Sequence, residues 1–199
     1  LVRGLRLPRF LANTSMTGLS HAYARFCVAS EGYRDLFARK GVRRERMAVT
    51  GSPNFDDVDA ARDNDFPHRG YVLAATSCLR ETLKPEDRGG FIRKAVRVAG
   101  GRPLLFKLHP NEDVSRARRE IERDAPQAMV LAEGNTLHMV ANCEALVTRY
   151  STVLLWALAL GKEVHSDLPD ADLSRLAPLQ TGGRSALRIA DVCREVMAA

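Results

Sequence analysis

The side chains best placed to do chemistry in this sequence are the hydroxyls of Ser151 and Thr152, which stand directly before an apolar stretch. Residues 153–160 are apolar on all sides and are followed by Gly161, a pattern typical of a buried helix closed by a glycine. The first N–H groups of a helix have no partner within it, so hydroxyls and the positive end of the helix dipole can together bind an anion there. An ordinary capped helix gives the same pattern. Both interpretations stay open at this stretch.

Two other polar segments follow predicted strands. Residues 71–75 are apolar and run into a polar loop at 76–82, and residues 104–108 run into a histidine-proline pair. In a parallel sheet, ligands bind where strands end and helices begin. The predicted anion site therefore draws on three loops, with these candidate residues: Ser77, Arg80, His109, Pro110, Arg149, Tyr150, Ser151 and Thr152.

The elements that would position these residues alternate between strand and helix. Predicted strands lie at 26–29, 47–50, 71–75, 104–108, 128–131, 146–147 and 163–165. The helix before Gly100 carries Ile92, Ala95, Val96 and Ala99 at helical spacing, and Lys107 is expected to point outward from its strand end. This alternation predicts an α/β fold, a Rossmann-like parallel sheet with helices on both faces. We expect one domain over residues 26–199, preceded by an arm or a remnant of a missing N-terminal domain over residues 1–25.

Composition describes a globular protein without a metal site. Of its 199 residues, 45% are hydrophobic and 27% are charged. The four cysteines and the histidines are scattered, so neither a metal site, a disulfide framework nor a bound cofactor has support in the sequence. The longest apolar run is too short to cross a bilayer. We expect a cytoplasmic protein.

The net charge of +6 indicates an anionic partner. Aromatic residues make up only 6% and no nucleic-acid-binding signature is present, so nucleic acid is not expected. Nucleotide phosphates, an anionic acceptor or an acidic membrane surface fit the charge equally well. Residues 1–10 mix leucines with three arginines and could contact the inner face of the membrane.

Four short motifs, in this order, resemble the C-terminal half of GT-B glycosyltransferases. They read VAS at 28–30, VTGSPNFD at 49–56, KLHPN at 107–111, and LVTRYSTV at 146–153 followed by LGK at 160–162. The likeness is greatest to CDP-glycerol glycerophosphotransferases and capsule polysaccharide transferases, and UDP-N-acetylglucosamine 2-epimerases share the plan. The resemblance covers roughly residues 26–167.

The resemblance implies roles for particular residues. In these families the histidine-proline loop and the later hydroxyl pair hold the nucleotide and its phosphates, which implies a catalytic role for His109 and binding roles for Pro110, Ser151 and Thr152. Gly51, in the second motif, allows a turn that brings the backbone close to another group, and we predict that it contacts the substrate. The partners implied are a CDP-, CMP- or UDP-linked sugar or polyol donor and a glycan acceptor.

This sequence departs from the family pattern at two places. Many polymer-forming relatives carry an acidic residue where this chain has Arg149. The epimerases and many UDP-sugar transferases place acidic residues in the helix after the hydroxyl pair, where this chain has Leu154, Leu155 and Trp156. The expected function is transfer of a nucleotide-activated sugar or polyol phosphate to a surface or capsular polysaccharide. A UDP-sugar 2-epimerase-like enzyme and a non-catalytic nucleotide- or partner-binding domain are the alternatives.

Overall fold

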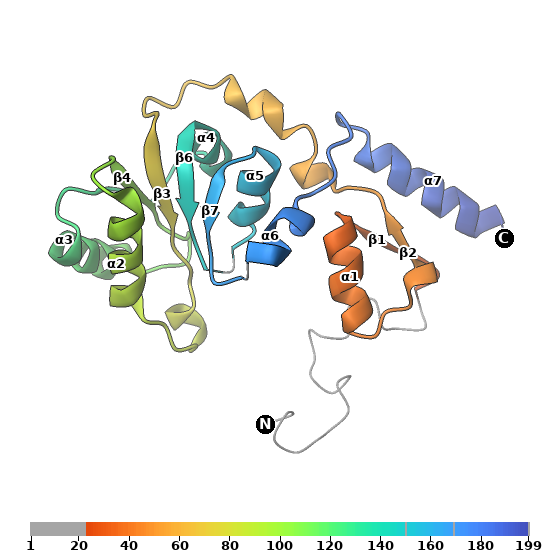
Figure 1. The fold of residues 1–199 in the computed structure, drawn as a ribbon, viewed down its shortest axis with the longest axis horizontal. Coiled ribbons are helices and arrows are strands. Elements are labelled where there is room, and N and C mark those ends of the chain that lie inside the picture. Colours follow the sequence, from red (N-terminus) through yellow and green to blue (C-terminus); the bar gives the residue numbers. More distant parts are fainter. Residues whose placement is uncertain (1–22, 150, 169, 199) are drawn as a thin grey trace, which may run out of the picture. The chain divides into compact units, whose positions relative to one another are not determined.

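The computed structural model describes residues 23–149, 151–168 and 170–198 (Figure 1). These residues fall into two compact units, one over 58–173 and one that joins 23–57 to 174–198. Most of the predicted N-terminal arm, the predicted membrane contact at residues 1–10, and Tyr150 lie outside the described residues. The predicted boundaries, an arm to residue 25 and one donor-binding domain over 26–199, stay predictions.

The larger unit is built on a five-stranded parallel sheet (Figure 1). Its strands lie in the order β5 (Met129–Leu131), β4 (Leu104–Lys107), β3 (Tyr71–Ala75), β6 (Cys143–Val147) and β7 (Glu163–His165). All four pairings are parallel. The chain runs outward from β3 to β4 and β5, then returns to the other side of β3 with β6. The predicted fold, a Rossmann-like α/β sheet, is confirmed.

Helices connect the strands and cover both faces of this sheet. They are α2 (Arg88–Ala99), α3 (Val114–Asp124), α4 (Thr136–Asn142) and α5 (Val153–Ala159), and α6 (Asp170–Leu176) follows β7. Three of them begin at a side chain that accepts a backbone N–H of the first turn: Asp87 for α2, Asp113 for α3 and Asn135 for α4. The larger unit also contains two short 3-10 helices, η5 (Val58–Arg62) and η6 (Arg80–Thr82), and the smaller unit contains η3 (Arg44–Arg46) and η4 (Pro53–Phe55).

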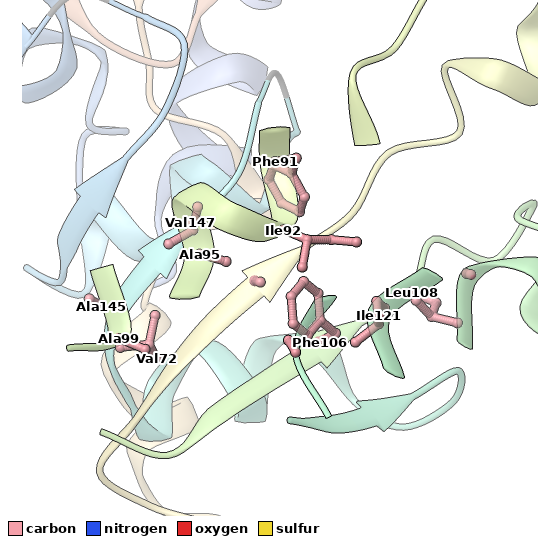
Figure 2. Close-up of a cluster of buried hydrophobic side chains, with 13 residues drawn as sticks. Val72, Phe91, Ile92, Ala95, Ala99, Phe106, Leu108, Ile121, Ala145 and Val147 are labelled. Atoms are coloured by element: carbon pink, nitrogen blue, oxygen red, sulfur yellow. The ribbon is translucent and has the colours of Figure 1, made fainter. Parts of the chain in front are cut away.

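Successive residues of β3 face opposite sides of the sheet, and all five are buried. Val72 and Ala74 pack with Phe106, Ile92 and Ile121, which come from β4, α2 and α3 (Figure 2). Tyr71, Leu73 and Ala75 face the opposite side, where residues of α4 and α5 cover them. A strand buried on both faces reads as a continuous apolar run, which is why residues 71–75 were predictable as a strand.

The apolar face predicted for α2 is one residue too wide. Ile92, Ala95 and Ala99 are buried as expected, but Val96 is 42% exposed. Phe91, Ile92, Ala95 and Ala99 are the buried apolar residues of this helix, and Val96, at i+4 from Ile92, lies at the edge of their face, on the side away from Phe91 and Ala95. The helix ends at Gly100, which takes a positive φ of 56° that a glycine adopts without strain.

The smaller unit contains a two-stranded parallel sheet, β1 (Phe26–Val28) with β2 (Met47–Val49), and the helices α1 (Glu31–Arg39) and α7 (Ser185–Ala198). The Ser30 hydroxyl caps the start of α1 by accepting the Tyr33 N–H at 3.3 Å, and it donates to the Arg175 carbonyl at 3.0 Å. The Asp56 carboxylate accepts the N–H groups of Thr181 and Ser185 at 2.6 and 2.9 Å, which ties the segment after β2 to the start of α7. In the part of the chain that the structure describes, β1 and β2 pair only with each other, and not with the larger sheet.

No helix within residues 23–149, 151–168 and 170–198 is both long enough and apolar enough to cross a membrane.

The core shown in Figure 2 makes a direct stability prediction. Ile121 is 1% exposed, so Ile121→Ala leaves a cavity beneath α3 and should lower the free energy of unfolding by about 2–5 kcal/mol. Val114→Ala is the matched control, because Val114 lies on the same helix but is 38% exposed; its effect should be about 0.5 kcal/mol. Urea unfolding measures both variants. Equal effects in the two variants would contradict this assignment of the buried face.

Candidate functional site

The carboxyl ends of β3, β4 and β6 meet at one edge of the sheet, because the three strands are parallel neighbours. Hydrogen bonds hold the first residues beyond these strands at that edge. The Thr76 N–H donates to the Lys107 carbonyl at 3.1 Å, and the Thr148 hydroxyl donates to the Ala75 carbonyl at 3.2 Å. This edge is where the strand order reverses, the usual ligand position in open α/β sheets. The structure thus brings the three predicted loops to one edge.

His109 is held at this edge by its backbone and by its ring. Its N–H donates to the Thr76 hydroxyl at 3.0 Å and to Glu112 Oε2 at 2.9 Å. Its ring Nδ1 accepts the Asn111 N–H at 3.1 Å, so the proton of the neutral imidazole lies on Nε2. Nε2 is 3.7 Å from the sulfur of Cys78 and the side chain is partly exposed. The ring therefore presents a hydrogen-bond donor, the group that a phosphate oxygen needs.

A chain of ion pairs lies behind His109 and ties the loop after β3 to α2 and α3. Arg88 pairs with Glu112 and Glu86, and Arg80 pairs with Glu86 and Glu120. The side chains of Glu86 and Glu112 are each only 1% exposed. The sequence did not indicate roles for Glu86, Arg88 and Glu112, because charged residues normally face water.

Two residues of the loop after β3 that were predicted to bind a ligand already contact carboxylates in the structure. Arg80 makes a bidentate contact with Glu120, at 2.7 and 2.9 Å, which raises the pKa of Arg80. The Ser77 hydroxyl donates to Glu86 at 3.0 Å. A ligand that used either side chain would have to displace a carboxylate. Substrate binding by Arg80 and Ser77 stays a prediction.

Two cationic side chains lie beside the end of β6. Arg149 Nε lies 3.4 Å from Asp167, and Lys94 Nζ lies 3.5 Å from the same carboxylate. Lys94 also donates to the Ser166 carbonyl at 3.0 Å. Two cations share one carboxylate, so this cluster carries a net charge of one positive unit. The cluster favours an anionic ligand at this edge.

Ser151 and Thr152 lie at the start of α5, as predicted. The Ser151 hydroxyl accepts the Val153 N–H at 3.3 Å, whereas the exposed Thr152 side chain makes no capping hydrogen bond. The helix has only seven residues, so the effect of its dipole is small and the hydroxyls matter more. Pro110 follows His109 and is exposed. Binding by these three residues stays a prediction.

Gly51 lies in the smaller unit and has a structural role there. Its φ is +82°, and a Cβ at this position would lie 2.3 Å from the Ser185 hydroxyl and 2.9 Å from the Leu179 carbonyl. Glycine is therefore required by the backbone conformation and by this close approach. These contacts account for the turn that the sequence analysis noted at residues 51–54. Contact of Gly51 with substrate stays a prediction.

The expectation that Lys107 points outward is wrong. Lys107 is 6% exposed, and its ammonium group donates to the carbonyls of Leu108 and Ala132, each at 2.8 Å. Burial lowers the pKa of Lys107. Both acceptors lie beyond strand ends, so the buried ammonium joins the segment after β4 to the segment after β5. The apolar neighbours in sequence did not indicate this direction, because Ala132 is distant in the chain.

Two further features bear on possible sites. A cavity of about 330 Å³ opens at the amino-terminal edge of the sheet, lined by residues that include His68, Arg69, Tyr71 and Gln127. It contains none of the predicted site residues. Among the described residues, no group of three or more His, Cys, Asp or Glu side chains is arranged to hold a metal ion.

No family model matches the sequence, and no curated protein matches it either. Several solved structures share the fold. The UDP-GlcNAc 2-epimerase of Methanocaldococcus jannaschii, in complex with UDP-GlcNAc and UDP, is 14% identical with a TM-score of 0.59; the match covers 86% of this chain and 61% of that chain. The UDP-GlcNAc 2-epimerase of Neisseria meningitidis, bound to UDP-GlcNAc, is 12% identical with a TM-score of 0.58, over 86% of this chain and 62% of that chain.

The wall teichoic acid polymerase TagF also matches, at 14% identity and a TM-score of 0.50, over 88% of this chain and 58% of that chain. At these identities the likeness establishes the fold. The resemblance to GT-B proteins found in the sequence is confirmed at that level, since epimerases and a teichoic acid polymerase are both structural neighbours. The match spans about three fifths of the length of these structures.

The Arg80–Glu120 pair can be tested by pH. Arg80, by its hydrogen bonds, lowers the pKa of Glu120 below its ordinary value of 4.5, so the pair stabilises the fold above that pH and its contribution is lost as pH falls through the lowered pKa. Between about pH 5 and pH 2, the unfolding free energy of the unmodified chain should therefore fall more steeply than that of Glu120→Gln. Urea unfolding at several pH values gives both slopes. Parallel slopes would mean that the pair does not form in solution.

Proposed function

We propose that this chain carries the donor-binding domain of a GT-B enzyme that transfers a nucleotide-activated sugar or polyol phosphate to a surface or capsular polysaccharide. The observation that carries the proposal is the imidazole of His109, which presents Nε2 as a donor at the edge where ligands bind in such sheets. Structural neighbours in complex with UDP-GlcNAc and UDP support a nucleotide-linked donor. CDP-, CMP- and UDP-linked compounds are the candidate donors, and a glycan is the candidate acceptor.

The residues at this edge suit the charge that the reaction creates. When the bond between the donor nucleotide and the transferred group breaks, negative charge builds on the leaving phosphate. Nε2 of His109 can donate to that phosphate, and the net positive cluster of Lys94, Arg149 and Asp167 adds a favourable field. The hydroxyls of Ser151 and Thr152 supply further donors at the start of α5. Donors already fixed in place need no reorganisation as the charge develops.

An epimerase of the same fold is the second candidate, because UDP-GlcNAc 2-epimerases are among the structural neighbours. The residues of α5 argue against it. Leu154 and Leu155 are buried and Trp156 is half-buried, so this helix presents no carboxylate at the positions where the family resemblance implies acidic residues in the epimerases. Acceptor-dependent release of nucleotide would favour transfer, whereas inversion at C2 of a UDP-linked sugar that keeps its nucleotide would favour the epimerase. Binding without either reaction would favour a non-catalytic domain.

Nucleotide titration tests the proposed function directly. CDP or UDP should bind the chain more tightly than CMP, because only the diphosphates have a second phosphate to reach His109. His109→Phe keeps a planar ring but removes the donor, and should weaken diphosphate binding by about 1–3 kcal/mol. His138→Phe, on helix α4, is the control and should bind as the unmodified chain does. Isothermal titration calorimetry measures the affinity of each protein for each nucleotide. If the unmodified chain binds none of CDP, UDP and CMP, the proposal is refuted.

The hydroxyl pair makes a separate prediction. Replacing Ser151 and Thr152 by alanine should weaken nucleotide diphosphate binding by about 1–3 kcal/mol, the range for lost hydrogen bonds to a charged group. The loss of the Ser151 cap should lower stability by about 1 kcal/mol. Thr152→Val separates the two effects, because the Thr152 side chain makes no capping bond and its loss should affect binding alone. Unchanged affinity in the folded double variant would remove the pair from the site.

A further inference from the structure

The carboxylate of Glu112 is buried directly behind His109. Its side chain is 1% exposed, although carboxylates are seldom buried so completely. Oε2 accepts the His109 N–H at 2.9 Å and the hydroxyl of Thr76. Since Thr76 follows β3 and His109 follows β4, this one oxygen joins the two loops that flank the candidate site. The turn is closed by the Glu112 N–H, which donates to the His109 carbonyl at 3.0 Å.

Arg88 fixes the other oxygen of this carboxylate. Its Nη2 contacts Glu112 Oε1 and donates to Glu86 and to the Ser77 carbonyl, both at 3.1 Å. The Arg88 side chain is 5% exposed, and its Nε and Nη1 atoms are buried without a hydrogen-bond partner in the described part of the chain. Glu86, Arg88 and Glu112 together bury two negative charges and one positive charge.

Stability alone does not account for such a cluster. Buried ion pairs lose most of their hydration, and apolar residues of similar volume often stabilise a fold as well or better. Unsatisfied guanidinium N–H groups add to the cost. What the cluster does provide is a fixed geometry: it holds the His109 backbone, which in turn keeps Nδ1 within 3.1 Å of the Asn111 N–H. That contact decides which ring nitrogen carries the proton.

From these contacts we infer that Glu112, held by Arg88, is a positioning residue that fixes the His109 loop so that the imidazole presents Nε2–H toward the donor phosphate. Glu112 does not touch the ligand; it acts through the backbone of His109 and through Thr76. The part concerning phosphate rests on the proposed function. The part concerning the ring holds in the free protein.

The ring state of His109 is the decisive measurement, because a purely structural role for Glu112 would leave it unchanged. In histidine-labelled protein, ¹⁵N NMR should show His109 with Nε2 protonated and Nδ1 as an acceptor. In Glu112→Gln the backbone is no longer fixed, and the two tautomers should interconvert and give averaged shifts. CDP or UDP affinity should fall about 10-fold in the same variant, the scale of loss when one buried hydrogen-bond partner is removed.

A neighbouring residue supplies the matched control. Asp113 stands next to Glu112 and caps α3 by accepting the Arg116 N–H at 2.9 Å, and its side chain takes no part in the hydrogen bonds that the described residues make to His109. Asp113→Ala should lower the melting temperature and leave both the His109 ring state and nucleotide affinity as they are. Thr76→Val is a second, isosteric test should Glu112→Gln fail to fold, and Thr76→Ser should restore the ring state by returning the hydroxyl.

These experiments distinguish failure of the positioning role of Glu112 from failure of the proposed function. An unchanged ring spectrum in folded Glu112→Gln, or in Thr76→Val where Glu112→Gln does not fold, overturns the positioning role. An unmodified chain that binds neither CDP nor UDP overturns the proposed function, while the ring spectra still decide whether Glu112 positions His109. An altered ring spectrum together with unchanged nucleotide affinity overturns the link between that position and the phosphate.

Discussion

The parallel pairing of β3 with β4 on one side and β6 on the other is the constraint on which the rest of the structure depends. It brings together residues that are more than 30 positions apart in the chain, such as Thr76 and His109. Because every strand of this sheet runs the same way, all the loops that leave its carboxyl ends share one edge. Polar side chains gather there without any sequence motif that spans them.

Charge at this edge is arranged in two layers with different environments. Glu86, Arg88 and Glu112 are buried beneath the His109 loop, where each charge interacts strongly with its neighbours. Lys94, Arg149 and Asp167 are partly exposed beside the end of β6, where solvent weakens each pair. The inner layer can determine geometry, and the outer layer can attract an anion. A phosphate that approaches the edge would meet the outer cations while the inner carboxylates remain covered.

The sequence was sufficient for the architecture and for part of the site. The apolar run at 71–75 and the alternation of strands with helices predicted the parallel sheet, because a short continuous apolar run is typical of a strand buried on both faces. The edge that carries His109 and Ser151 followed from that topology. The partners of single side chains could not be predicted. Arg80 pairs with Glu120 and Lys107 donates to the Ala132 carbonyl, and both partners are far along the chain. Glu86, which accepts from Ser77, is nearer in sequence but carries no pattern that marks it as a partner. Nor did the sequence distinguish β1 and β2, which form their own sheet, from strands of the larger one.

Strand β3 buries all five of its side chains and Thr76 beyond it is also buried, whereas residues 77–81 are partly buried and residues 82–84 are exposed. A substitution within the strand must satisfy packing on two faces at once, and few side chains can do so. Substitutions at residues 82–84, which are exposed, meet water and have no such packing to satisfy. Evolution can therefore vary the exposed part of this loop while the strand beneath it stays as it is.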